Sequence, residues 1–305
     1  MEKHRKKLIK NAAVFDGHSS GLAQGKKIVI EDDIVTEITA DEVSEENFDE
    51  VFDGTGMVAM PGMTDAHVHM GCLFAKGEFP VDYATVLTVA KCKDALMAGV
   101  TTFRDAGSVS EGLKLAFDEG VLPGPRIYPC GAYISQTCGH GDSEYAHTYR
   151  DIQYRHPSST VLADGVPEII RAVREQFYRG ASHIKLTATE ILNRHEDIRL
   201  LFGTDMMITG PDYQVEQSED IRYYEKRFGT MRALRALTGT ANEVFALTTY
   251  QNPYLKGKIG VLEAGAFADL LLVDGDPTKS VSVLADTDHL RLIMKGGTVY
   301  KNTLC

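Results

Sequence analysis

Two histidines separated by one residue, His67 and His69, are the residues of this sequence best suited to metal chemistry. A short apolar run and the pair Pro61-Gly62 precede them, which predicts a β-strand that ends by presenting both imidazoles. Side chains at positions i and i+2 leave a strand on the same face, so the two rings can meet one ion. Imidazole is the commonest protein ligand for zinc-like metals, and the spacing therefore indicates a metal site, although a chance pair of surface histidines has the same pattern.

Three further residues have side chains suited to the same chemistry. Lys185 lies in an apolar run, residues 181–189, where an ammonium is costly unless it is paired, reaches water or loses its charge. Asp205 closes another apolar run as Gly-Thr-Asp, a pattern that fits a carboxylate ligand as well as a turn or a helix N-cap. His140 lies between glycines, which let the backbone approach a ligand closely, but it could also be a loop histidine in water.

The surrounding motifs carry a resemblance to a known family. Residues 58–69, Val-Ala-Met-Pro-Gly-Met-Thr-Asp-Ala-His-Val-His, closely resemble the first-strand motif of the metal-dependent amidohydrolase superfamily. Residues 258–277 resemble its IGxLxxGxxADLxxxDxDP run, and the Gly-His-Gly-Asp and Ile-Lys-Leu segments match in order between these two. The resemblance points to the branch of Xaa-Pro dipeptidases, other metal-dependent dipeptidases and imidazolonepropionase-like hydrolases.

The resemblance implies an α/β fold, a TIM-type β/α barrel accompanied by a small β-sandwich that both chain ends form. The sequence is consistent with this fold, because a helical pattern over residues 81–97 is followed by a β-branched, glycine-bounded run over residues 99–107. Residues 125–134 and residues 181–189 predict a third and a fourth barrel strand. We expect residues 1–60 to form the first part of the sandwich, residues 61–254 the barrel, and residues 255–305 the rest of the sandwich.

The middle of the barrel is shorter than the resemblance predicts. After the fourth strand the sequence passes almost directly, through residues 189–197, into the motif of the last strand. Residues 61–254 number 194, whereas an eight-stranded barrel takes about 250. We therefore expect barrel strands five and six, each normally ending in a metal-binding histidine, to be missing. His195 lies in this junction, and its charged neighbours favour a linker residue over a replacement ligand.

The resemblance also implies a role for each candidate residue. His67, His69 and Asp205 would hold the more buried metal, and Asp205 would also act as general base. Lys185 would be carbamylated by carbon dioxide and would bridge to a second metal, and His140 would contact the substrate. The implied cofactor is a divalent metal, most often zinc, as one or two ions.

Composition and charge exclude several other classes of protein. The net charge of −11 argues against a nucleic-acid partner, and no apolar run is long enough to cross a membrane. The basic segment at residues 1–7 has no apolar core after it, so we expect no signal peptide and a cytoplasmic location. Five cysteines without a CxxC pair predict buried free thiols in place of a disulfide framework.

Two functional hypotheses follow. The first is a metal-dependent hydrolase of non-ester C–N bonds, acting through metal-activated water on a small molecule such as a dipeptide or an N-acyl amino acid. The second is a catalytically impaired or inactive relative with a deletion, in which the unpaired edges of a shortened barrel could be completed by forming a homo-oligomer. The first hypothesis requires His67, His69, Lys185 and Asp205 to converge at one end of the strand ring.

Overall fold

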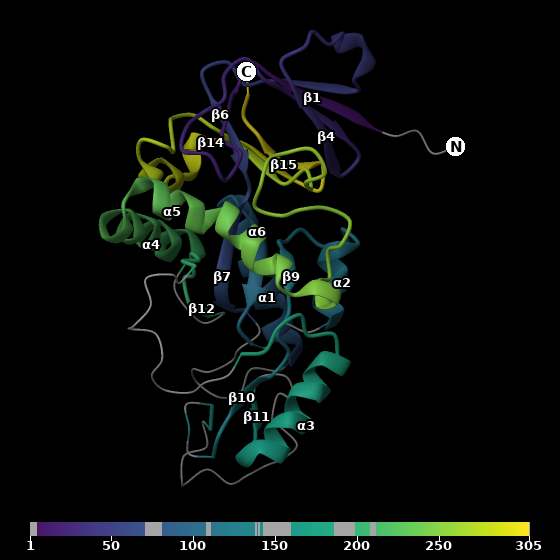
Figure 1. The fold of residues 1–305 in the computed structure, drawn as a ribbon, viewed down its shortest axis with the longest axis vertical. Coiled ribbons are helices and arrows are strands. Elements are labelled where there is room, and N and C mark those ends of the chain that lie inside the picture. Colours follow the sequence, from purple (N-terminus) through teal and green to yellow (C-terminus); the bar gives the residue numbers. More distant parts are fainter. Residues whose placement is uncertain are drawn as a thin grey trace.

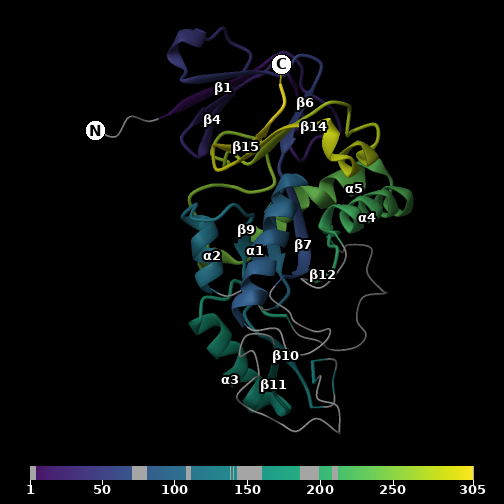
Figure 2. The same ribbon diagram turned by 180° about the vertical axis from the view of Figure 1, so that it is seen from behind.

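A computed structural model describes residues 5–70, 81–107, 111–137, 139, 141–142, 160–185, 199–207 and 212–304. Two sheets that contain both chain ends lie at one end of the molecule, and a parallel sheet with its helices lies in the middle (Figure 1). A small unit of two strands and one helix lies at the opposite end, and the view from behind agrees (Figure 2). No helix in the described part of the chain is long and apolar enough to cross a membrane.

The end of the molecule that contains both chain ends consists of two sheets that share one apolar core. One sheet has the order β4-β3-β1-β5 and the other the order β15-β14-β13-β6-β2. Alternation along β3 buries Ile28 and Ile30, which pack with Leu270 and Leu272 of the second sheet. Strands from both chain ends therefore form this unit together, as the sequence predicts. Its strands are β1 (Lys6–Lys10), β2 (Ala13–Val14), β3 (Lys27–Glu31), β4 (Ile34–Thr39), β5 (Glu50–Asp53), β6 (Val58–Pro61), β13 (Leu270–Val273), β14 (Leu290–Lys295) and β15 (Thr298–Asn302).

The middle sheet is parallel and has the order β12-β7-β8-β9. Helices connect its consecutive strands, which is the βα alternation that the sequence predicts. β6 passes through Gly62 into β7, and a side chain at Gly62 would lie 2.2 Å from Thr101 Oγ1. The strands are β7 (Met63–His69), β8 (Val100–Asp105), β9 (Arg126–Tyr128) and β12 (Met206–Met207), with α1 (Val81–Met97) and α2 (Glu111–Asp118) between them.

Three helices follow β12, of which α4 contacts α1 and α6 lies on the side of the sheet away from α1. Leu234 and Leu237 of α5 share a core cluster with Val68 of β7 and Leu96 of α1. Figure 1 shows α6 in front of the sheet, and Figure 2, the view from behind, shows α1 in front of it. The helices are α4 (Tyr213–Phe228), α5 (Thr230–Leu237) and α6 (Gly239–Ala246), and the short 3-10 helices are η1 (Glu45–Asn47), η2 (Thr249–Gln251), η3 (Val281–Ala285) and η4 (Thr287–His289).

The predicted third strand, residues 125–134, is divided in two. β9 ends at Tyr128, and β10 (Tyr133–Ser135) pairs instead with β11 (Thr160–Leu162) beside α3 (Gly165–Tyr178). The chain breaks here because Pro129 has no N–H for a ladder bond and Gly131 takes a left-handed conformation with φ of 69°. The segment that ends at Lys185 runs beside this break and beside β10. The Ser182 N–H donates to Pro129 O at 2.7 Å, and the Ile134 N–H donates to Lys185 O at 3.0 Å.

The last barrel strand is shorter than the apolar run predicts, since only β12 is a regular strand. The residues before it still follow β7, because the Ala66 N–H donates to Phe202 O and the Asp205 N–H to His67 O, both at 2.8 Å. Residues 186–198, which include His195 and the junction at 189–197, lie outside the described residues. The absence of strands five and six and the domain boundaries therefore remain predictions.

Candidate metal centre at the end of strand β7

β7 is buried along almost its whole length and presents His67 and His69 on one face. Their Nε2 atoms are 3.3 Å apart, and the ring centroids are 5.3 Å apart. His69 is only 6% exposed, whereas the His67 ring is half-buried. The strand therefore directs two imidazole nitrogens at one point, with one side of that point open to solvent.

Asp205, which directly precedes β12, reaches the same point. Its Oδ1 lies 3.2 Å from His67 Nε2 and 3.3 Å from His69 Nε2. The residue is placed there by the hydrogen bond from its own N–H to His67 O and by a left-handed backbone conformation with φ of 56°. One ligand atom from each of the three residues lies within 4.8 Å of the others, a spacing that can hold a metal ion.

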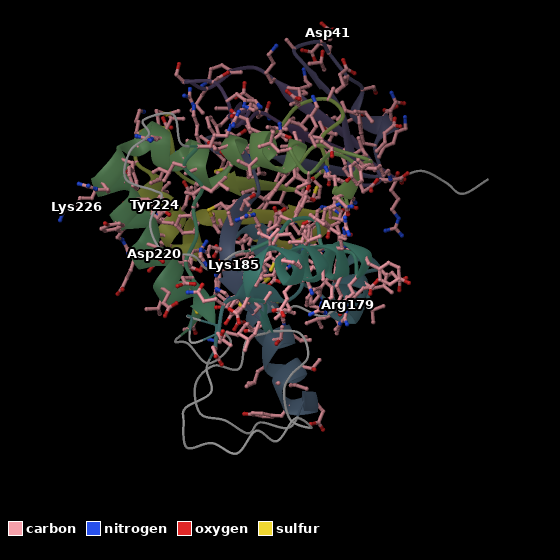
Figure 3. All side chains as sticks on the ribbon, turned by 60° about the horizontal axis from the view of Figure 1, so that its bottom comes forward. Asp41, Arg179, Lys185, Asp220, Tyr224 and Lys226 are labelled. Atoms are coloured by element: carbon pink, nitrogen blue, oxygen red, sulfur yellow. The ribbon has the colours of Figure 1, made fainter. Side chains whose placement is uncertain are left out.

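Lys185 completes the cluster from the segment that runs beside β10. Its Nζ is 2.9 Å from His67 Nε2 and 2.8 Å from His69 Nε2, and the side chain is partly buried. Figure 3 labels Lys185 in the middle of the molecule. The structure therefore brings together all four side chains that the sequence suggested as ligands. The fifth candidate, His140, lies outside the described residues.

The electrostatics of the cluster suit a divalent cation. Burial, together with the Lys185 ammonium, lowers the pKa of His67 to about 4, so its imidazole is neutral at pH 7 and keeps a lone pair for a metal. The hydrogen bond with His69 lowers the pKa of Asp205, and this carboxylate is ionised. Two imidazoles and one carboxylate form a donor set that zinc uses in catalytic sites, and the residues present fit the metal.

A residue of this site that the sequence analysis missed is Asp65. It is fully buried and lies on β7, two residues before the first of the two histidines. Burial raises the pKa of Asp65 to about 6, although hydrogen bonds from Thr204 and Tyr213 oppose the rise. A carboxylate inside an apolar strand was the available signal, because such a group must be hydrogen-bonded to be tolerated.

A second missed residue is His183, which precedes Lys185 by two. Its Nε2 lies 3.0 Å from Asp105 O and its Nδ1 lies 3.0 Å from Ser182 Oγ. Burial, with a smaller effect of Arg104, lowers its pKa to about 3, so the ring is neutral. His183 therefore joins the end of β8 to the segment that carries Lys185.

Comparison with known proteins agrees with these features. The model of the amidohydrolase family matches residues 58–197. Ochratoxinase of Aspergillus niger is 34% identical over 152 residues, which cover 43% of this chain and 31% of that protein. Imidazolonepropionase of Picrophilus torridus is 27% identical over 176 residues, which cover 53% of this chain and 43% of that protein. The chain thus matches less than half the length of either relative.

The fold is shared with solved structures. A prolidase crystallised with N-methylphosphonate-L-proline superimposes with a TM-score of 0.82 at 22% identity, covering 97% of this chain and 100% of that one. The common fold is that of the amidohydrolases, of TIM-barrel type. By family match and fold together, the chain is similar to the amidohydrolase superfamily, and the proteins that it resembles include a prolidase and an imidazolonepropionase.

Proposed function

We propose that this protein is a metal-dependent hydrolase of amide C–N bonds. The observation that carries the proposal is the convergence of His67, His69, Asp205 and Lys185 on one point at the end of β7. His67, His69 and Asp205 would bind one divalent ion, with zinc favoured by the nitrogen and oxygen donors. Lys185, once carbamylated, would add an anionic oxygen ligand and bridge to a second ion.

The chemistry then divides between the ion and the side chains. When bound, a divalent ion polarises the scissile carbonyl and lowers the pKa of water toward neutrality. Asp205 is ionised and its side chain is 73% exposed, so it can accept a proton from the attacking water. The water oxygen bonds to the carbonyl carbon, the C–N bond breaks, and Asp205 returns the proton to the leaving nitrogen.

For the substrate we propose a dipeptide or an N-acyl amino acid. Support comes from the prolidase and the Xaa-Pro dipeptidase among the proteins that share the fold. His140 is proposed to contact the scissile carbonyl or the substrate carboxylate. The proposed location is the cytoplasm.

A second candidate is a relative that has lost activity. The described residues supply two histidines and one aspartate for a single ion, together with Lys185. If the shortened barrel lacks the histidines of strands five and six, a second ion would have no further ligands from them. Such a protein could complete its sheet with a second copy of the chain.

Elemental analysis of the purified protein tests the proposal. After expression with added zinc we expect about one bound ion or more per chain, and a large loss of metal in His69→Asn. Activity toward dipeptides and N-acyl amino acids should disappear with the metal. A wild-type chain that carries only a trace of zinc, manganese or cobalt would contradict the proposal, and metal without activity would favour the second candidate.

A further inference from the structure

Asp205 has an unusual backbone for a residue of its kind. Its φ of 56° lies in the left-handed region, which residues other than glycine rarely adopt; among those residues, asparagine and aspartate tolerate it best. Conformations of this kind persist only where neighbouring contacts hold them, and they occur often at functional sites. Contacts with neighbouring residues must therefore hold Asp205 in this conformation.

One source of these contacts is the carboxylate of Asp65. It accepts hydrogen bonds from the hydroxyl of Thr204 at 2.7 Å and from the hydroxyl of Tyr213 at 2.8 Å. It also accepts from the N–H groups of Thr204 and His67, each at 3.2 Å. A fully buried carboxylate thus connects β7, residue 204 and the start of α4.

The backbone on both sides of Asp205 is fixed through these groups. Thr204 makes two bonds to Asp65, and its Oγ1 also accepts a bond from the Met206 N–H at 3.1 Å. Asp205 itself donates its N–H to His67 O. A rotation of Asp205 toward the favoured right-handed region would have to break one or more of these bonds.

We propose that Asp65, Thr204 and Tyr213 form a positioning clamp that holds Asp205 in its left-handed conformation and thereby directs Oδ1 at the His67 and His69 nitrogens. This inference rests on the proposed function in one respect, that Asp205 is a metal ligand. None of the three clamp residues is among the proposed ligands of the ion. They act through the backbone of Asp205 and through the His67 N–H.

Thr204→Val is the variant that tests the clamp, because it removes the hydroxyl and keeps the branched shape. Thr204→Ser keeps the hydroxyl and should restore the behaviour of the wild type. Thr64→Val is the control, since it makes the same substitution at a buried threonine of β7 whose hydroxyl has no hydrogen-bond partner within the described part of the chain. Circular dichroism would check that each variant is folded.

The first readout is Co²⁺ binding by the full chain, measured by competition with a chelating dye and by the visible spectrum of the bound ion. Loss of a residue that orients a metal ligand typically lowers metal affinity 10- to 100-fold, and we expect a loss of that size in Thr204→Val, together with an altered Co²⁺ spectrum. Thr204→Ser and Thr64→Val should stay near the wild type. Equal Co²⁺ affinity and spectrum in Thr204→Val and Thr64→Val would overturn the inference.

The second readout needs no metal. In a crystal structure of metal-free Thr204→Val we expect Asp205 to leave the left-handed region and Oδ1 to move away from the imidazoles. An unchanged Asp205 backbone would overturn the clamp whatever the metal measurements show. If the clamp fails while Asp205→Asn still weakens Co²⁺ binding, the proposed function stands; if the wild type binds no Co²⁺, the proposed function fails by itself.

Discussion

The buried ion pair between Arg126 and Asp269 provides a strong test of how the barrel is attached to the sandwich. Arg126 begins β9 of the barrel sheet, and Asp269 directly precedes β13 of the sandwich. Nε donates to Oδ2 at 2.7 Å and Nη2 donates to Oδ1 at 3.2 Å, while the side chains are 10% and 3% exposed. Asp269 also accepts the Gly296 N–H at 2.6 Å. Asp269→Asn should therefore leave a buried guanidinium without its counter-charge.

The magnitude follows from this burial. Removing one partner of a buried, hydrogen-bonded ion pair typically costs about 3–5 kcal/mol, because the remaining charge stays desolvated. That cost is a large part of the 5–15 kcal/mol by which a typical domain is stable. At about 2 °C per kcal/mol for a chain of this size, the melting temperature should fall by roughly 6–10 °C.

Urea unfolding and thermal melting of Asp269→Asn provide the assay. The matched control is Glu243→Gln, which breaks the exposed pair between Arg199 and Glu243, whose side chains are 53% and 50% exposed. Exposed pairs contribute at most about 1 kcal/mol, so this control should lie close to the wild type. A loss of less than about 1 kcal/mol in Asp269→Asn, or an equal loss in both variants, would refute the reasoning.

Two further predictions concern the C-terminal attachment and the site. Burial would raise the pKa of Glu225, but hydrogen bonds from Ser282, Thr230, Ser280 and the Val281 N–H outweigh it and lower the pKa below 4.5. The stability that Glu225 contributes is therefore complete above its pKa in the unfolded chain and is lost as the pH falls through its lower pKa in the folded protein. Glu225→Gln should lower the free energy of unfolding in urea by about 1 kcal/mol at pH 7 and by less at about pH 3. An equal difference at the two pH values would contradict this prediction. Gly203→Ala would place a Cβ 2.7 Å from His67 Cβ, and it should weaken Co²⁺ binding, whereas Gly21→Ala, with nothing within 4 Å, should not.

Much of the site could be predicted from the sequence because the signals for it lie in residues that are close together along the chain. The spacing of His67 and His69 fixes their common face, and a lysine in an apolar run signals an unusual environment at position 185. The residue motifs also place Asp205 next to β7, where the structure has it, although the regular strand β12 begins after Asp205 and does not end at it. The roles of these residues as ligands remain predictions.

The rest could not be predicted because it depends on contacts between distant segments. The carboxylate of Asp65 meets Thr204 and Tyr213, which are 139 and 148 residues away along the chain. The division of the third strand depends on which neighbour each half pairs with, since β9 pairs with β8 and β10 with β11. Two of the predicted buried thiols, Cys92 and Cys130, are confirmed as buried.

The most direct test of the metal centre is anomalous diffraction at the zinc absorption edge from crystals grown with Zn²⁺. We predict a peak within about 2.0–2.2 Å of His67 Nε2, His69 Nε2 and an Asp205 carboxylate oxygen, the distances usual for zinc. Crystals that contain zinc but show no peak at these three atoms would contradict the metal site and the hydrolase built on it.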